Sequence, residues 1–439
     1  MSINRRRKNR IRIGSGPGGL AGSVACGSAA LVMSFAPTMA PAQEALRSLP
    51  AGDASAAARR AQEAAMPYTF ALNDLRVLVA PSVAFTWNDN VNVAENNAQQ
   101  DFIVSPSVQL AASYPVSQQN LLSLNVGAGY DQYLTHDEYS TLFLQSGTAL
   151  SFDVYVKDFW INLHDHAQYV RGSGQPGQQA EVANTAEYNT IDNMAGLNVT
   201  WDVNTVMLSA GYDHEDVISG TQQFDYLNRS TELLFTKAGF RVLPKVAAGA
   251  EATAAFTRYA RAVFNDNNGY SAGLYADWQP GQYFRLQARA GFCTYLFRHT
   301  SRSIQTGDLN SWYVDVKLRH EIAKAFGYSL DAGHQANLGI EADAVEAWYV
   351  RPNIHWTAFK QLELTAFFDY EHGRQGVANV AGNLTENYDW WGMGIGASYE
   401  FMKNLTVSLN YRLTLRSSND ADRSYDQNLV SLAFTYHPQ

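Results

Sequence analysis

Apolar and polar side chains alternate without a break along residues 405–416, where the chain reads LTVSLNYRLTLR. Leu405, Val407 and Leu409 fall on one side of an extended segment, and Thr406 and Arg412 fall on the other. Successive side chains of a strand point to opposite faces, so the pattern predicts a strand with one apolar and one polar face. Such strands occur in antiparallel soluble sheets and in membrane barrels alike.

The same two-faced pattern recurs from about residue 72 to residue 436, interrupted by short turns and longer polar loops in alternation. The expected short turns are 116–120, 156–158, 202–204, 243–245, 279–281, 323–325, 359–361 and 402–404. The longest expected loops are 171–188, 216–226 and 374–387. Because the short turns recur at intervals of roughly forty residues, the hairpin is the predicted repeating unit.

Aromatic residues cluster where the apolar faces end. They are Tyr114, Tyr130, Phe152, Trp201, Tyr212, Trp278, Trp312, Trp356, Tyr370, Trp391 and Phe401. Such belts mark the two lipid interfaces of a membrane barrel, whereas a β-sandwich buries its apolar faces against each other. The sequence therefore predicts an all-β fold, a closed antiparallel transmembrane β-barrel of about eighteen strands, with sixteen also compatible. Short turns are expected on the periplasmic side and long loops on the extracellular side.

The N-terminal segment has the composition of a secretory leader. Basic residues at positions 5–12 precede a run of small and apolar residues at 18–35, and the residues at 40–42 fit a small-residue cleavage site. A cytosolic basic arm is the alternative. The predicted organisation is a signal peptide at 1–42, a periplasmic Ala-rich tail or short helix at 43–70 and an outer-membrane β-barrel at 71–439.

Composition narrows the class of partner. The net charge of −9 disfavours a nucleic-acid-binding surface, which is usually basic. Only Cys26 and Cys293 occur, so a framework of several disulfides is excluded. After the leader, no apolar run approaches the ~18 residues that a membrane-spanning helix needs. Together with the strand pattern, these features predict a location in the bacterial outer membrane.

The alternation also assigns polar side chains to the barrel interior. The candidate lumen-lining residues are Arg285, Arg289, Lys317, Arg319, Arg351, Arg412, Arg416, Asp131, Asp213, Glu363, Asp369, Tyr295, Tyr313 and Tyr349. Their charges are expected either to pair with neighbours and keep the bore hydrated, or to guide an anionic solute along the arginine-rich second half. The tyrosine rings are expected either to stack against sugars or to pack against inward loops.

Two short constellations contain the residue types of metal sites. His164 and His166 flank Asp165, but no third ligand is identifiable, so histidines at the rim are the favoured interpretation. Residues 213–216 (DHED) offer oxygens to a divalent cation, but a solvated loop base is favoured. No GxSxG or HExxH motif occurs, so we expect no enzyme, no cofactor and no metal.

The chain combines short turns such as MKN and LPK with glycine-rich polar faces and with paired aromatics at strand ends. In these features the chain resembles the outer-membrane β-barrel porins and, among them, the β-barrel porin-2 family, over about residues 72–436. The resemblance implies a pore, and the association of that family with exopolysaccharide export implies a polysaccharide cargo and periplasmic export proteins as partners.

The sequence thus predicts an outer-membrane pore that passes hydrophilic solutes, or that serves as the exit channel for an exopolysaccharide. Its expected partners are outer-membrane lipid and the hydrophilic solute or polysaccharide, with no nucleic acid. The alternative is a surface receptor, adhesin or structural barrel whose long loops plug the lumen.

Overall fold

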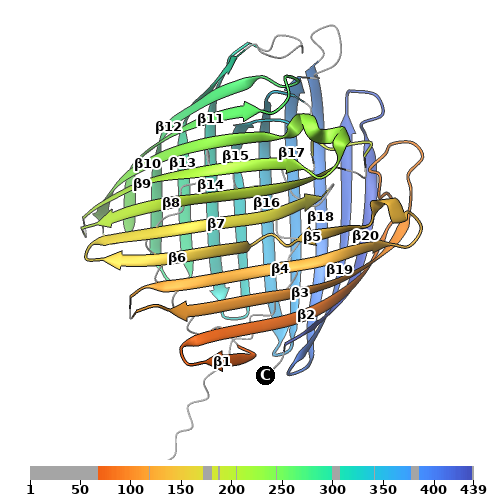
Figure 1. Ribbon diagram of the computed structural model, residues 1–439, viewed down its shortest axis with the longest axis horizontal. Coiled ribbons are helices and arrows are strands. Elements are labelled where there is room, and N and C mark those ends of the chain that lie inside the picture. Colours follow the sequence, from red (N-terminus) through yellow and green to blue (C-terminus); the bar gives the residue numbers. More distant parts are fainter. Residues whose placement is uncertain are drawn as a thin grey trace, which may run out of the picture. The chain divides into compact units, whose positions relative to one another are not determined.

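The chain forms one antiparallel sheet that closes on itself (Figure 1). The computed structural model describes residues 68–117, 119–171, 180–185, 188–203, 205–243, 245–298, 307–340, 342–376 and 385–437, all within the unit Val32–Gln439. The predicted signal peptide at 1–42 and the predicted tail at 43–70, apart from residues 68–70, lie outside the described residues.

Strands make up nearly all of the described chain. They are β1 (Phe70–Leu72), β2 (Leu75–Asn88), β3 (Asp101–Pro115), β4 (Leu121–Tyr133), β5 (Thr141–Leu144), β6 (Thr148–Val156), β7 (Phe159–Arg171), β8 (Asn189–Asp202), β9 (Val206–Ser219), β10 (Arg229–Leu243), β11 (Val246–Tyr259), β12 (Asp266–Gly281), β13 (Phe284–Arg298), β14 (Leu309–Ala323), β15 (Phe326–Asn337), β16 (Val345–Phe359), β17 (Leu362–Gly376), β18 (Thr385–Met402), β19 (Leu405–Ser418) and β20 (Tyr425–Tyr436). Within the described ranges, two 3-10 helices, η1 (Asp137–Tyr139) and η3 (Gln222–Leu227), lie in loops. Among the described residues, no helix is long and apolar enough to cross a membrane.

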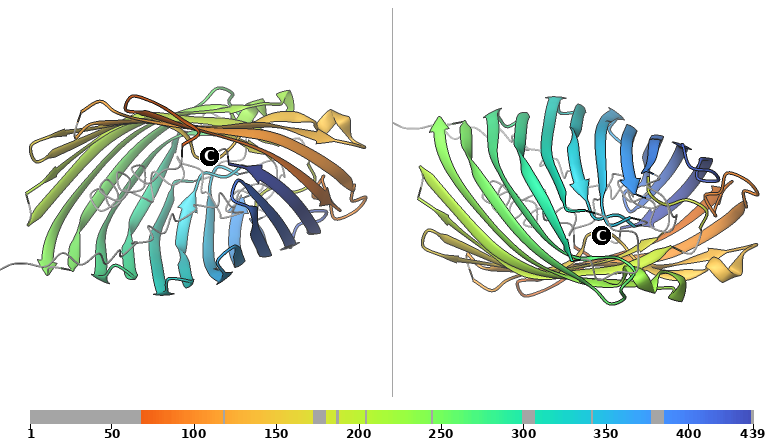
Figure 2. Two further views of the ribbon diagram at one scale, coloured as in Figure 1. Left: turned by 90° about the horizontal axis from the view of Figure 1, so that it is seen from below. Right: turned by 90° about the horizontal axis from the view of Figure 1, so that it is seen from above.

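The barrel wall contains eighteen strands, which confirms the predicted number. β5 and β6 both pair with β4 and together count as one strand of the wall. β1 pairs only with the first residues of β2 and is not counted as a strand of the wall. Each remaining strand pairs with its neighbours in sequence, and β2 pairs with β20 from Asn88↔Leu429 to Ser82↔Thr435. The last pairing closes the barrel, and the two views of Figure 2 show the strands enclosing its interior. Closure leaves no long open edge to the sheet.

Short turns and long loops alternate as predicted, with three differences in their bounds. β12 continues to Gly281, so the predicted turn at 279–281 is wrong, and the turn lies at 282–283. Pro280 is tolerated there because the strand register shifts between Trp278 and Gly281, where a residue without an N–H fits. β9 continues to Ser219, so the first residues of the predicted loop at 216–226 belong to a strand. β17 continues to Gly376 and β18 begins at Thr385, so both ends of the predicted loop at 374–387 belong to strands.

Side chains alternate between the two faces of the wall. In β19, Asn410 and Arg412 are buried towards the interior, whereas Leu409 and Tyr411 are exposed on the outside. The polar face of the strand is therefore the inner one, and the apolar face is the outer one. This arrangement is the reverse of a soluble barrel, whose apolar side chains fill the core.

Loops from several parts of the ring pack against one another at the end that carries the long loops, which the sequence predicts to be the extracellular end. Their apolar cluster contains Val93, Val182, Ala183, Tyr188, Phe224, Leu227, Phe264, Ile340 and Tyr425. Most of these residues belong to loops that are distributed around the ring, so the loops must cross the lumen to meet. Burial among these loops raises the pKa of the Tyr188 phenol. The extracellular end of the barrel is consequently narrowed by packed protein.

Candidate functional site

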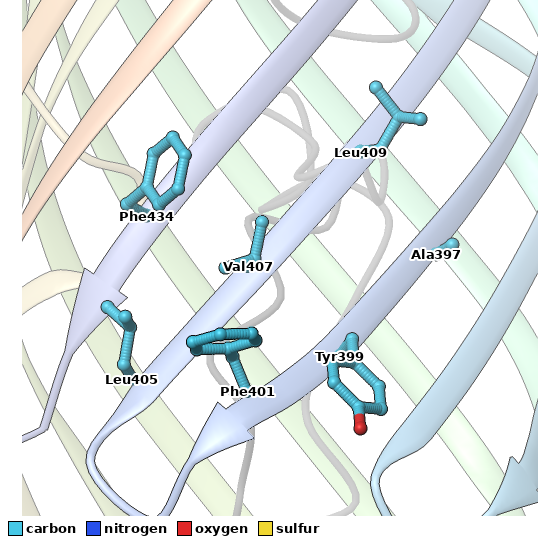
Figure 3. A pocket seen from close by; sticks show the side chains of 7 residues that line it. All are labelled: Ala397, Tyr399, Phe401, Leu405, Val407, Leu409 and Phe434. Carbon is cyan, nitrogen blue, oxygen red and sulfur yellow. The ribbon is translucent and has the colours of Figure 1, made fainter.

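Large apolar side chains cover the outer face of the barrel. Leu274 and Phe292 are 68% and 76% exposed on neighbouring strands. Figure 3 shows an outer groove on β18, β19 and β20 lined by Ala397, Tyr399, Phe401, Leu405, Val407, Leu409 and Phe434. Exposed Trp278 and Trp356 lie near the periplasmic turns, and exposed Trp312 lies near the extracellular end. So large an exposed apolar surface is unfavourable in water. An apolar band between aromatic belts is therefore the surface that faces lipid.

The chain is an outer-membrane β-barrel.

The inner wall carries a band of ten charged side chains on strands from β10 to β19. This charge belt consists of Lys237, Glu251, Arg289, Asp315, Lys317, Asp331, Arg351, Asp369, Glu371 and Arg412. Neighbouring strands place opposite charges next to each other in register, as Lys237↔Glu251, Arg289↔Asp315 and Lys317↔Asp331 show. Because the belt has five basic and five acidic members, its formal charges cancel.

One part of the charge belt is centred on Arg289. Its Nη2 atom donates to Asp315 Oδ2 at 2.6 Å, and its Nη1 atom lies 3.7 Å from Glu251 Oε1. Tyr313 donates its hydroxyl hydrogen to Glu251 at 3.0 Å, and Tyr349 donates to Asp315 at 3.2 Å. The two carboxylates therefore have both a cation and a phenol as partners.

A second part of the charge belt is centred on Arg351, which is almost completely buried. Its Nε atom donates to Asp369 Oδ1 at 3.0 Å, and its Nη2 atom donates to Glu371 Oε2 at 3.2 Å. Tyr388 donates to the other oxygen of Glu371 at 2.9 Å. The next cation along the wall is Arg412, whose guanidinium carbon lies 5.8 Å from the centre of the Trp390 ring. The arginines of the charge belt are thus held by carboxylates and rings rather than left to the solvent.

Inner side chains become more exposed towards the periplasmic end. On β14, Asp315 is buried, Lys317 is half-buried and the Arg319 side chain is 74% exposed. On β17, Asp369 is buried, whereas Glu363, which lies closer to the periplasmic turn, is half-buried. The gradient indicates a lumen that is open at the periplasmic end and narrows towards the extracellular loops.

Several predicted residues make local ion pairs outside the charge belt. Arg285 pairs with Asp277 at 2.6 Å, and Arg319 pairs with Glu321 at 3.1 Å. The geometry of these pairs favours the first of the two expectations for the lumenal charges, that they pair with neighbours and keep the bore hydrated.

The three predicted tyrosines lie on the inner face, but their rings are packed against the wall. A Cβ atom at Gly273 or Gly291 would collide with the Tyr313 ring, and a Cβ atom at Gly333 would collide with Tyr349. Tyr295 donates its hydroxyl hydrogen to the carbonyl oxygen of Ala336 at 3.2 Å. The rings therefore cover glycines of neighbouring strands or pack under an inward segment. This packing favours the structural expectation over stacking against sugars.

The two predicted histidines lie inside the lumen, so the expectation that they stand at the rim is wrong. His164 and His166 project inwards from β7 with their ring centres 5.3 Å apart. His164 lies 3.0 Å from a carboxylate oxygen of Asp213 and 2.9 Å from Asn162 Oδ1. Asp213 therefore has an imidazole as its partner. Another predicted residue, Asp131 on β4, accepts a hydrogen bond from the Ser105 hydroxyl at 2.6 Å.

Residues 213–216 do not form the solvated loop base that the sequence suggests. They belong to β9, so Asp213 and Glu215 face inwards, whereas His214 and Asp216 face outwards. On the outside, His214 lies 3.0 Å from Glu232 of β10. Alternation thus separates the four side chains, and the part of the chain that the structure describes holds no cluster of His, Cys, Asp and Glu able to bind a metal.

A buried polar cluster joins the extracellular loops to the ends of β18 and β19. Glu386 accepts hydrogen bonds from Arg416 at 2.5 Å, from Arg423 at 3.0 Å and from Ser418 at 2.6 Å. Arg416 also donates to the carbonyl oxygen of Ala180 at 2.7 Å, and Arg423 donates to that of Glu181 at 2.8 Å. We refer to these residues, Ala180, Glu181, Glu386, Arg416, Ser418 and Arg423, as the loop latch.

The loop latch extends to a second loop, because Glu181 accepts a hydrogen bond from the backbone N–H of Ile340 at 2.7 Å. Of its members, sequence reasoning identified only Arg416. Glu386 falls in the predicted loop at 374–387, although the alternation that places Trp390 on the inner face of β18 continues back through Tyr388 to Glu386. That extended alternation is the signal that could have found it.

No protein-family model and no curated protein matches the chain. Solved structures with a similar fold include OccK2 (OpdF) of Pseudomonas aeruginosa in complex with glucuronate, at 12% identity and a TM-score of 0.48, covering 85% of this chain and 100% of that chain. OpdL of Pseudomonas aeruginosa has 12% identity and a TM-score of 0.45, with 84% and 100% covered. OccAB3 of Acinetobacter baumannii has 8% identity and a TM-score of 0.46, with 83% and 100% covered. At these identities the likeness concerns the fold alone.

Proposed function

We propose that this barrel is an outer-membrane channel through which small hydrophilic solutes pass between the exterior and the periplasm. The observation that carries the proposal is the polar inner wall, in which charged side chains surround an interior that is progressively exposed towards the periplasm. A wall of this kind keeps water in the bore and disfavours apolar solutes. The packed extracellular loops restrict passage to small molecules.

The cancelling charges of the charge belt leave the half of the wall from β10 to β19 without a net preference for anions or cations. An arginine-lined path for anions would need guanidinium groups that are not already paired, but Arg289 and Arg351 both contact carboxylates. Uncharged and zwitterionic solutes fit such a wall because they can exchange hydrogen bonds with donors and acceptors in turn.

Single-channel recording in a planar bilayer tests the proposal. Steady ohmic openings with a reversal potential near zero in a salt gradient are expected. Lys317→Gln removes a half-buried positive charge from the charge belt, so it should shift the reversal potential towards cation selectivity. Lys360→Gln, in an exposed periplasmic turn, is the matched control and should leave the potential unchanged.

A loop-plugged barrel, acting as a surface receptor, adhesin or structural protein, is the second candidate. The apolar loop cluster at the extracellular end favours it, because packed loops can close a lumen as well as narrow it. A folded protein that produces no openings in the bilayer would favour this candidate over the channel.

Three expectations from the sequence stay predictions. They are exopolysaccharide exit, delivery by periplasmic export proteins and membership of the β-barrel porin-2 family. No contact among the described residues distinguishes a polymer from a small solute, and the narrowed extracellular end suits the smaller one. Swelling of proteoliposomes in sugars of increasing size provides the test. Equal permeation of a monosaccharide and a long oligosaccharide would favour the polymer.

A further inference from the structure

The barrel wall contains a seam where two neighbouring strands stop pairing. β14 and β15 form a ladder that ends at the extracellular side with Val314↔His334. Beyond that pair, Leu309–Tyr313 pair with β13 and Gln335–Asn337 pair with β16, and among the described residues no backbone pairing joins β14 to β15 there. Open strand edges are costly in hydrocarbon, so an edge in a membrane barrel occurs where it borders protein or a cavity.

Side chains close this seam in place of a ladder. The imidazole Nδ1 of His334 lies 2.9 Å from the carbonyl oxygen of Trp312, which accepts a hydrogen bond when Nδ1 carries the proton. The rings of His334, Trp312 and Trp348 pack against one another, with His334 centred 4.3 Å from Trp312 and 4.9 Å from Trp348, and with the two indole rings 5.3 Å apart. Ser311 donates its hydroxyl hydrogen to Glu346 at 2.5 Å. Because only side chains bridge the gap, it can open while every backbone ladder stays intact.

Behind the seam, the end of β15 lies inside the line of the wall. Every residue from Gly333 to Asn337 is buried, whichever way its side chain points. Ala336 and Leu338 pack against side chains on the inner face of β13. We call this cluster the inner layer; it consists of Cys293, Tyr295, Phe297, Ala336 and Leu338. Apolar surface therefore continues from the lipid side of the seam into the barrel.

A polar group is buried at the inner mouth of the seam. Gln335, the first residue of β15 beyond the ladder, is 3% exposed, and within the described residues neither polar atom of its amide has a hydrogen-bond partner. A buried amide without partners is costly, which points to a polar group that binds there. At the outer mouth, Glu346 lies opposite Arg374 in the β16–β17 ladder, so the formal charges cancel.

We propose that the seam between β14 and β15 is a lateral portal for an amphipathic molecule with an apolar chain and an uncharged polar head. When the contact between Trp312 and Trp348 opens, the chain passes from the outer leaflet into the inner layer, and the head binds the Gln335 amide. This route crosses the wall of the barrel and is separate from the passage of hydrophilic solutes along its axis.

Photolabelling from the bilayer tests the portal. A long-chain alcohol with a diazirine in its chain is incorporated into proteoliposomes of the full chain, in a background with Cys26→Ala and Cys293→Ala. After irradiation, mass spectrometry should find label on Tyr295 and Leu338 of the inner layer. Phe292, on the outer face of β13, should also be labelled, because it contacts lipid directly. Label on Phe292 without label in the inner layer would overturn the proposal.

Bridging the seam provides the decisive comparison. Ser311→Cys and Glu346→Cys, joined by a short bifunctional thiol reagent, should abolish labelling of the inner layer and preserve that of Phe292. The control is Ser398→Cys with Ser408→Cys, because these hydroxyls lie 2.8 Å apart on the fully paired β18 and β19. The bridged control should keep both labels. Inner-layer labelling that survives the bridge across the seam would overturn the portal.

Two further measurements keep the test independent of folding and of the axial pore. Trp348→Ala removes one of the rings that close the seam and should increase inner-layer labelling; unchanged or reduced labelling contradicts the proposal. Single-channel conductance of the same samples reports the axial channel, and the bridge should leave it unchanged. Loss of conductance in every sample would reject the proposed channel but would not affect the portal.

Discussion

Replacing Glu386 by Gln should release the extracellular loops. Glu386 is buried, and its carboxylate holds Arg416 and Arg423, which in turn bind the backbone of Ala180 and Glu181. The neutral amide retains an acceptor oxygen but loses the charge that balances the two guanidinium groups. It also places an N–H₂ group where donors already point.

The magnitude follows from the burial of both partners. The side chains of Glu386 and Arg416 have no exposed surface, so screening by water is absent. Removing one member of a buried ion pair typically costs about 3–5 kcal/mol. If about 3 kcal/mol of this cost destabilises the closed arrangement of the loops relative to the open one, the ratio of open to closed loops rises by roughly a hundredfold.

Single-channel recording measures that ratio as the fraction of time spent in the higher-conductance state. The variant should show frequent transitions to a larger conductance, where the wild-type protein shows rare ones. Glu138→Gln is the matched control, because Glu138 is an exposed glutamate in η1. If the Glu386→Gln protein folds and its open fraction equals that of the wild type, the loop latch does not control access to the lumen.

Three further predictions concern stability. Arg351→Gln leaves two buried carboxylates without their cation and should lower the free energy of unfolding in urea by about 3–5 kcal/mol; an unchanged midpoint would argue against these ion pairs. Gly273→Val places a branched side chain against the Tyr313 ring and should reduce the yield of heat-modifiable folded barrel, whereas Gly281→Ala, with no heavy atom within 4 Å of the new Cβ, should not. Leu274→Arg introduces a charge on the outer face and should cost about 2–4 kcal/mol in a urea titration in lipid vesicles; a neutral effect would mean that this position does not face hydrocarbon.

The architecture of the wall was predictable because it depends on a local property. Alternation assigns Arg412 and Leu409 to opposite faces whatever strands lie beside β19, and the structure agrees. Counting alternating segments then gives the number of strands. The misplaced turn at 279–281 shows the limit of such reasoning: Pro280 is a common turn residue, but a register shift lets β12 accommodate it.

The partners of the inner side chains were less predictable, because they depend on register between strands. Alternation places His164 and Asp213 on the inner face, but their contact requires the pairing of β7, β8 and β9. The loop latch is harder still, since Arg416 joins Glu386 of β18 to Ala180 only when the loop that holds Ala180 reaches this part of the wall. No periodic signal records such contacts.

The central claim is that the polar face of the wall surrounds a water-filled path and that the apolar face contacts lipid. Lys317 and Leu318 are neighbours on β14 that point to these opposite sides. In a background without native cysteines, each is replaced by Cys and exposed to a charged, water-soluble thiol reagent during single-channel recording. The account predicts a stepwise fall in conductance for Lys317→Cys and none for Leu318→Cys. Equal responses of the two variants, or a folded barrel without conductance, would contradict it.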